Sequence, residues 1–221
     1  MSLPFYVPPE QLMKDRAEFA RKGIARGKSM VAISYDGGVL LLGENPSRTL
    51  QKISEVYDRI AFAAVGKQNE FEQLRVGGIR RADITGYAYS RADVTARSLA
   101  TAYAQTLGHI FTQEVKPYEV ELMVVEVGQE QGSDTLFRIT YDGTLYDDRE
   151  FSAIGGSAEA LTAHIGKAFA PGMTLDDAIA LAKEACLAVA HDNGASGWEA
   201  AILDRAARRR AFRRLGSAEL E

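Results

Sequence analysis

The segment Gly23–Ser29 is the first place where residue types and spacing suggest chemistry, because it reads Gly-Ile-Ala-Arg-Gly-Lys-Ser. A Gly-Lys-Ser ending is typical of loops that bind nucleotide phosphates, but those loops also carry a glycine five positions before the second one. Lys22 occupies that position here. A phosphate loop also follows a strand and opens a helix, whereas this sequence predicts a helix before the segment and a strand after it. We therefore expect no nucleotide cofactor.

The three histidines and the single cysteine are further candidates for metal binding or nucleophilic catalysis. His109, His164 and His191 fall on separate predicted segments, and their spacing matches no metal-ligand pattern. Cys186 lies within a predicted helix, five positions from His191, and residues five apart do not share one helix face. A small core residue is the simpler interpretation of this cysteine. No metal site is expected.

Gly155, Gly156 and Ser157 resemble part of a nucleophile elbow, but Glu159 stands where that motif has its last glycine. The segment is more simply a turn from a strand to a helix, with Ser157 as the helix N-cap. Taken alone, the residues contain no catalytic constellation. This favours a structural or interaction protein over an enzyme.

A dense group of arginines near the end of the chain raises the question of nucleic-acid binding. The whole chain is acidic, however, with 26 basic and 30 acidic residues and a net charge of -4. Phe212 is the one aromatic residue within the group, which surrounds a predicted turn between strands. A solvated edge or a salt-bridged surface between subunits is the better interpretation, and no nucleic-acid partner is expected. The group comprises Arg205, Arg208, Arg209, Arg210, Arg213 and Arg214.

Length and composition limit the class of protein. The 221 residues are enough for one large domain, and 46% hydrophobic with 25% charged residues is typical of a soluble globular chain. No apolar run is long enough to cross a bilayer, and the N-terminus lacks the pattern of a secretion signal. A single cysteine cannot form an internal disulfide, which fits a reducing compartment. We expect one domain over residues 1–221, in the cytoplasm, with no membrane partner.

Two short strands around a tight turn form the element that the others must position. Residues 30–35 and 39–42 are apolar and flank Asp36-Gly37-Gly38, where glycine accepts the positive φ of a hairpin turn. Neither strand alternates between apolar and polar residues, which indicates a sheet covered on both faces. A helix over residues 9–22 precedes the hairpin, behind an extended tail over residues 1–8. Its narrow apolar stripe indicates packing either on its own domain or on a neighbouring chain.

The later elements come as strand hairpins and helix pairs. This order predicts an α+β fold, a four-layer α-β-β-α sandwich of two stacked, mainly antiparallel sheets with a core from about 28 to 215 and an extra N-terminal helix. Helices are expected over residues 67–81, after the N-cap Asp93, after Ser157 and after Thr174. The further strands are expected at 52–56, 58–65, 120–127, 136–141, 144–146, 151–154, 198–203 and 211–215.

The hairpin, the helix before it and the order of elements resemble the proteasome family, within the N-terminal-nucleophile hydrolase fold. The similarity is greatest to the α subunits of actinobacterial 20S core particles, and it spans nearly the whole chain. The segments that carry it are Asp15–Glu18, Ala20–Gly27, Gly43–Ser47, Leu50–Glu55, Tyr57–Arg59, Phe62–Lys67, Tyr103–Gly108, Ile110–Thr112, Lys116–Glu121 and Arg138–Gly143.

The resemblance separates two subunit types. In catalytic β subunits a threonine at the mature N-terminus begins the first strand, its free amine acts as the base, and a nearby lysine lowers the nucleophile's pKa. Aligned on the Gly37-Gly38 turn, that position falls at Lys28, which cannot act as a hydroxyl nucleophile. The resemblance therefore implies a non-catalytic α subunit of a threonine-type endopeptidase complex. An autoprocessed hydrolase that uses Ser29, one residue later, stays open as the alternative.

The resemblance also implies the partners. Seven copies would form each outer ring around two β-subunit rings, and N-terminal tails would gate the entry of protein substrates. A hexameric ATPase or an ATP-independent activator ring would insert its C-terminal tails into pockets between adjacent α subunits. Lys52 matches the lysine that pairs there with the incoming carboxylate, and Arg21 is expected near the same pocket. The implied gate consists of Met1, Ser2, Leu3, Pro4, Phe5, Tyr6, Val7 and Pro8.

Overall fold

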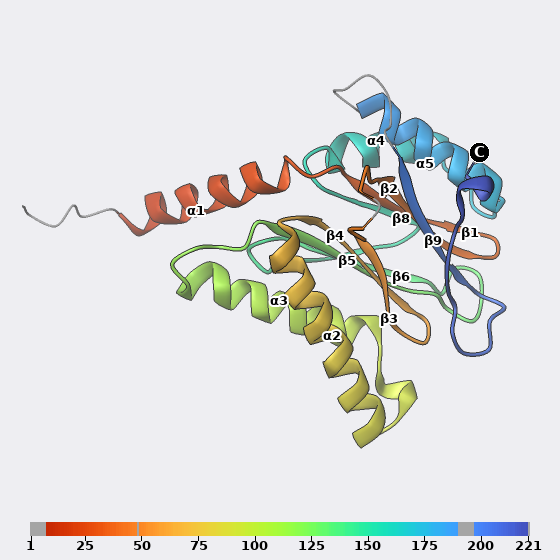
Figure 1. The fold of residues 1–221 in the computed structure, drawn as a ribbon, viewed down its shortest axis with the longest axis horizontal. Helices are drawn as coiled ribbons and strands as arrows, with labels where there is room; N and C mark the ends of the chain where they lie inside the picture. Colours follow the sequence, from red (N-terminus) through yellow and green to blue (C-terminus); the bar gives the residue numbers. More distant parts are fainter. Residues whose placement is uncertain (1–7, 48, 190–196, 221) are drawn as a thin grey trace, which may run out of the picture.

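The computed structural model describes residues 8–47, 49–189 and 197–220. They form two five-stranded antiparallel sheets that stack on one another, with helices over both outer faces (Figure 1). The expected α+β class and four-layer arrangement are confirmed.

The first sheet has the strand order β10-β9-β2-β1-β8. Its centre is the predicted hairpin, in which Met30 pairs with Gly43 and Tyr35 with Gly38. Every residue of β2 is buried, so this sheet is covered on both faces as expected. The strands are β1 (Met30–Tyr35), β2 (Gly38–Glu44), β8 (Phe151–Ile154), β9 (Trp198–Asp204) and β10 (Phe212–Arg214).

The second sheet has the order β3-β4-β5-β6-β7, again with all neighbours antiparallel. The predicted strand over residues 58–65 begins later than expected, because Asp58 and Arg59 form the turn between β3 and β4. The last strand extends beyond Tyr146 to Asp148. The strands are β3 (Ile53–Tyr57), β4 (Ile60–Gly66), β5 (Val120–Glu126), β6 (Thr135–Ile139) and β7 (Leu145–Asp148).

The helices divide between the two outer faces. α4 and α5 pack on the first sheet, and α2 and α3 pack on the second (Figure 1). Three apolar clusters fill the two helix-sheet layers and the space between the sheets, which holds the sandwich together by burial of apolar surface. The helices are α1 (Pro9–Ile24), α2 (Gln68–Ala88), α3 (Ala96–Gln113), α4 (Ala158–Ala168) and α5 (Leu175–Val189), with 3-10 turns at η1 (Arg91–Asp93) and η2 (Ser217–Glu219).

Three helix boundaries differ from the sequence-based expectation. α1 continues two residues beyond Lys22, because Ile24 is buried in the core between the sheets. α2 runs to Ala88 rather than Arg81, because tertiary packing of its inner face outweighs the low helix propensity of its two glycines. The N-cap of α3 is Thr95, whose hydroxyl accepts from the amide of Ser98, and not Asp93.

α1 packs on its own domain only at its C-terminal end. Ala20 and Ile24 are buried against the sheets, and the Arg16 guanidinium donates to the carbonyl oxygen of Ile110. The N-terminal half extends away from the sandwich (Figure 1). Packing on its own domain is therefore confirmed for the C-terminal end of the helix. Packing of the projecting end on a neighbouring chain stays a prediction.

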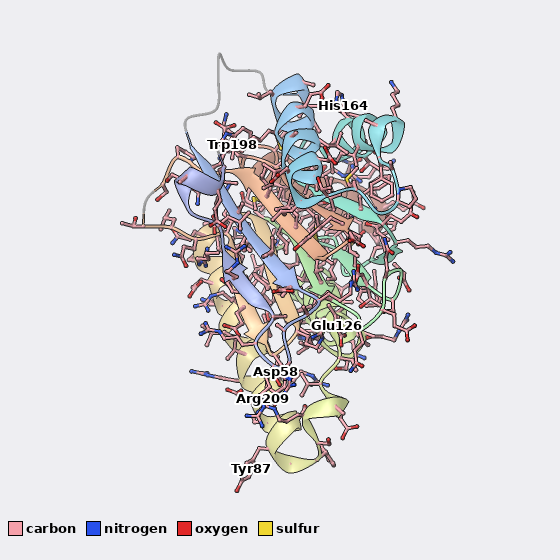
Figure 2. The ribbon with its side chains drawn as sticks, turned by 90° about the vertical axis from the view of Figure 1, so that its right-hand side faces the viewer. Asp58, Tyr87, Glu126, His164, Trp198 and Arg209 are labelled. Atoms are coloured by element: carbon pink, nitrogen blue, oxygen red, sulfur yellow. The ribbon has the colours of Figure 1, made fainter. Side chains whose placement is uncertain are left out.

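The predicted arginine-rich turn connects β9 and β10 and lies beside the β3–β4 turn. Figure 2 shows Arg209 and Asp58 close together at this end, and the Ala211 amide donates to the Asp58 carbonyl oxygen at 2.7 Å. Several arginines pair with carboxylates of the same chain, which supports a salt-bridged surface over a bare cationic patch. The pairs are Arg205–Asp134, Arg210–Glu55, Arg213–Glu219 and Arg214–Glu199.

Candidate functional site

Lys52 lies directly before β3 and is half-buried. Its ammonium donates to the carbonyl oxygen of Lys28 at 3.1 Å and to that of Glu44 at 3.1 Å. Lys28 precedes β1 and Glu44 ends β2, so the ammonium joins the entrance and the exit of the predicted hairpin. The side chain is therefore fixed by the fold and does not extend freely into solvent.

Glu199 positions the backbone that carries Lys52. One carboxylate oxygen accepts from the Lys52 amide at 2.9 Å, and the other accepts from the Ile53 amide at 3.0 Å. The same carboxylate accepts from the side-chain amide of Asn45 at 2.7 Å and pairs with Arg214 at 3.1 Å. Only a tenth of the Glu199 side chain is exposed, so these hydrogen bonds form in surroundings from which most water is excluded.

Burial and the neighbouring charges shift the pKa of the Lys52 ammonium in opposite directions. Burial lowers the pKa of its ammonium, and the nearby Glu199 and Glu44 carboxylates raise it, with a net shift below the ordinary lysine value. Lys28 also lowers this pKa through charge repulsion, while its own ammonium lies 3.3 Å from the Glu44 carboxylate. The result is a compact cluster of two lysines and two acidic residues at one end of the hairpin.

Ser29 lies in the connection between α1 and β1. Its hydroxyl accepts a 3.4 Å hydrogen bond from the Ser157 amide, and a Cβ on Gly155 would crowd the same hydroxyl. Within the described residues, no histidine or carboxylate is bonded to this hydroxyl. The sequence-based alternative with Ser29 as nucleophile thus receives no geometric support.

Arg21 lies in a cavity whose lining does not include Lys52. Its guanidinium is 5.7 Å from the centre of the Tyr141 ring, and it lines a cavity of about 820 Å³ between α1, the β6–β7 turn and the start of α4. Glu121 and Arg138 contribute charged groups to this cavity, and the Gly155 amide donates to Glu121 at 2.7 Å. Burial raises the pKa of the Glu121 carboxyl.

The Lys52 cluster and the cavity that Arg21 lines are neighbouring regions of the chain. The Lys52 ammonium donates to the Lys28 carbonyl oxygen, and the next residue, Ser29, accepts from the amide of Ser157, which lines the cavity. Lys52 itself is not part of this lining, so the two regions are adjacent but distinct.

The expected gate residues Met1 to Val7 lie outside the described residues. Pro8 is described, and its carbonyl oxygen accepts from the Leu12 amide at 3.1 Å, in the first turn of α1. The tail therefore joins the projecting end of this helix.

The histidines and the cysteine were the other candidates from the sequence. The Nε2 atom of His164 on α4 lies 3.4 Å from the Oε1 atom of Glu184 on α5. His191 is outside the described residues. Burial raises the pKa of the Cys186 thiol to about 12, as expected for a core cysteine and not a nucleophile. Among the described residues, no group of His, Cys, Asp or Glu side chains is arranged to hold a metal ion. None of the described helices is long and apolar enough to cross a membrane.

Sequence reasoning did not identify Glu199, Asn45 or Glu44 as parts of the Lys52 site. Glu199 is 147 residues away from Lys52 along the chain, and its local sequence is that of an ordinary strand. The sequence did contain a usable signal, because Glu44 is an acidic residue at the end of an apolar run. The structure shows that Glu44 is only 8% exposed. A buried carboxylate of this kind requires a partner.

The chain is similar to known proteins over nearly its whole length. Residues 24–203 match the Proteasome family, described as "Proteasome subunit". The chain is 56% identical to "Proteasome subunit alpha" of Xylanimonas cellulosilytica, over all of this chain and 95% of that protein. It is 54% identical to the protein of the same name from Thermobifida fusca, over 97% of this chain and 88% of that protein. The similarity therefore extends over the described sheets, the Lys52 cluster and the Arg21 cavity.

Proposed function

This chain belongs to the proteasome family, and we propose that it is the non-catalytic α subunit of a 20S core particle, forming the outer ring, gating substrate entry and docking activator rings. We propose that residues 1–221 form a single α-type domain. Its relatives are named as α subunits over essentially their full length, which confirms the sequence-based assignment to this subunit type.

The observation that carries the proposal is the contact between Lys52 and Lys28. In catalytic members of the family a lysine lies near an N-terminal threonine, and counting back from the Gly37-Gly38 turn puts position 28 in the place of that threonine. Here Lys28 is an internal residue behind α1, and Lys52 donates to its backbone carbonyl oxygen. A lysine is thus present beside position 28, but position 28 has neither the hydroxyl nor the free amine of an N-terminal threonine. This supports a scaffold role without peptidase activity of its own.

A docking pocket between copies is part of what we propose. We infer from the family resemblance that, in a closed ring of seven, the surfaces that carry Lys52 and Arg21 contribute to a pocket between adjacent copies. A pocket built in this way exists only in the assembled ring. It would appear seven times around the rim.

Lys52 is suited to bind a carboxylate. An ammonium has three protons, and two of them donate to Lys28 and Glu44, which leaves one for a further acceptor. Those two bonds also fix the direction of the third. An incoming C-terminal carboxylate would therefore meet a preoriented cation and form a charge-assisted hydrogen bond. The half-buried position reduces competition from water.

The tail and α1 support a gate. Residues 1–8 join the end of α1 that projects from the sandwich. In a ring, a segment attached there is available to converge with its six equivalents over a central opening. We propose that Met1 to Pro8 restrict entry in this way and that an activator ring displaces them.

The partners we propose are further copies of this chain, proteasome β subunits, and either a hexameric ATPase or an ATP-independent activator ring. Protein substrates would pass through the ring in the cytoplasm, without a cofactor, a nucleic acid or a membrane taking part. The cleavage chemistry would belong to the β subunits.

Coexpression with a β subunit from the same organism tests the proposal. We expect a four-ring cylinder in electron micrographs, with threonine-type peptidase activity that requires the β nucleophile. The matched control replaces that β nucleophile with alanine, which should leave the cylinder intact and inactive. Peptidase activity in the control, or in this chain purified alone, would contradict the non-catalytic assignment.

A further inference from the structure

The C-terminal tip of α2 carries a group of exposed apolar and aromatic side chains. Ile84, Tyr87 and Tyr89 are 67%, 95% and 81% exposed. Three of the nine large hydrophobic side chains that are exposed in the described chain thus lie within six residues. Single residues of this kind are ordinary on a surface, but a group of them on one projecting element marks an interaction site. Tyrosine is also among the residues that contribute most to binding between proteins.

Contacts beneath the tip hold it in a fixed position. Gly86 packs directly on Tyr57 at the end of β3, since a Cβ on Gly86 would clash with the Tyr57 hydroxyl. The Arg91 guanidinium follows the tip, lies 5.0 Å from the centre of the Tyr57 ring and pairs with the Asp58 carboxylate. A surface that is already fixed loses less conformational freedom when it binds, so this tip is suited to a protein partner.

The arginine-rich turn between β9 and β10 belongs to the same fixed region. The Ala211 amide of this connection donates to the Asp58 carbonyl oxygen at 2.7 Å. Figure 2 shows Arg209 beside Asp58, at the end of the molecule where Tyr87 projects. Arg208 and Arg209 are exposed, and neither forms an ion pair with another described residue. An apolar tip bordered by two such cations fits a partner surface that is apolar and bordered by carboxylates.

This region lies at the opposite end of the strands from the Lys52 cluster. Lys52 precedes β3 and Asp58 follows it, so six residues of nearly extended chain separate them by about 20 Å. Trp198 pairs with Glu44 at the Lys52 end, and Figure 2 shows Trp198 far from Tyr87. The activator that we propose occupies the Lys52 end. In a stack of rings the opposite end then faces away from the activator, toward the next ring.

We propose that the surface formed by Ile84, Tyr87, Tyr89, Arg208 and Arg209 is the one with which this chain binds the proteasome β-subunit ring. The tip would bury its tyrosine rings against an apolar area of a β subunit, and the two arginines would pair with carboxylates at the border of that area. The inference rests on the proposed function, because it assigns a surface to the β-subunit partner named there. A second copy of this chain is the competing occupant, which the test separates.

The first arm of the test removes the tyrosine rings. This chain and a β subunit from the same organism are purified separately and mixed, and native mass spectrometry gives the β-subunit concentration at which half of the chain is in cylinders. For Tyr87→Ser combined with Tyr89→Ser, we expect this concentration to rise by at least about tenfold. The matched control, Tyr87→Phe combined with Tyr89→Phe, keeps both rings and should stay within about twofold of the wild type.

The second arm reverses the charge of the arginines. Arg208→Glu combined with Arg209→Glu should raise the half-maximal β-subunit concentration by at least about threefold, because like charges would then meet across the contact. Arg208→Lys combined with Arg209→Lys keeps the charge and should assemble at nearly the wild-type concentration. Circular dichroism checks that each variant is folded. If the double serine variant is unfolded, Ile84→Ser replaces it, with an expected rise of at least about threefold.

The outcomes separate this inference from the proposed function. A wild-type chain that forms no cylinder with the β subunit would contradict the α-subunit assignment and, with it, this inference. Wild-type cylinders together with unchanged half-maximal concentrations in the serine and glutamate variants would overturn this inference alone. If the chain purified by itself forms an oligomer that the serine variant loses, the surface lies between copies of this chain and the proposal is wrong.

Discussion

The ammonium of Lys52 lies 3.1 Å from the carbonyl oxygen of Lys28, the residue two positions before β1. The hydrogen bond ties the start of β3 to the start of β1. It also uses a backbone oxygen, so it does not depend on the side chain at position 28. The cation is thereby held at the end of the hairpin whether or not a reacting group is present.

Lys52→Ala should weaken activator-stimulated protein degradation without preventing ring assembly. Loss of a charge-assisted hydrogen bond to a carboxylate corresponds to about 10- to 100-fold weaker docking. Titration of the activator into the assembled particle measures this change. Lys167→Ala, at an exposed position on α4, is the matched control. Half-maximal stimulation at the wild-type activator concentration would exclude Lys52 as the docking residue.

Deletion of residues 1–8 should accelerate peptide hydrolysis by the particle that contains active β subunits. The reason is steric: the segment attached to the projecting end of α1 would no longer cover the opening. Initial rates with a fluorogenic peptide measure the effect. A variant in which the same eight residues become Gly and Ser separates the role of the sequence from that of the length. Equal rates with and without the segment would argue against gating.

Intact-mass analysis distinguishes the scaffold from an autoprocessed hydrolase. We expect the purified particle to contain a chain that still includes residues 9–28, because Ala20 and Ile24 of α1 are buried in the core between the sheets. Ser29→Ala should leave peptidase activity unchanged. A dominant mass that begins at Ser29, lost in the Ser29→Ala variant, would establish self-cleavage instead.

Glu199→Ala should destabilise the fold by about 3 kcal/mol. The change removes the acceptor for two backbone amides and leaves Arg214 without its carboxylate partner in a mostly buried site. Denaturant unfolding followed by circular dichroism measures this loss. Glu184→Ala is the matched control, because the Glu184 side chain is 71% exposed and pairs with His164 on the surface. A loss below about 1 kcal/mol would mean that Glu199 does not position β3.

The unfolding free energy should depend on pH through Glu121. Burial raises the pKa of this carboxyl above its ordinary value of 4.5, so the folded state holds the proton more tightly than the unfolded state. The stabilising contribution of the protonated form is complete below pH 4.5 and is lost as pH rises through the folded-state pKa. Glu121→Gln should therefore be more stable than the wild type at pH 7 and should lose that advantage near pH 4. Denaturant unfolding at both pH values checks this, and a less stable variant at pH 7 would contradict it.

The sequence by itself determined the order of the elements and the type of fold. The hairpin around Asp36-Gly37 follows from two apolar runs and a glycine turn, and these depend on neighbours in the chain. The docking role expected for Lys52 came from the resemblance to the proteasome family. The early end predicted for α2 was wrong because local propensity counted the glycines and could not include the packing of Gly78 beneath Tyr103.

Only the tertiary structure decided how Lys52 is held and where Arg21 lies relative to it. The carboxylate of Glu199 reaches Lys52 because β9 pairs with β2 and brings a residue from a distant part of the chain to the start of β3. The guanidinium of Arg21 lies over the Tyr141 ring because the β6–β7 turn is close to the end of α1. Pattern along a chain reports which face of an element is buried, but strand order and side-chain partners depend on contacts between segments that are distant in sequence.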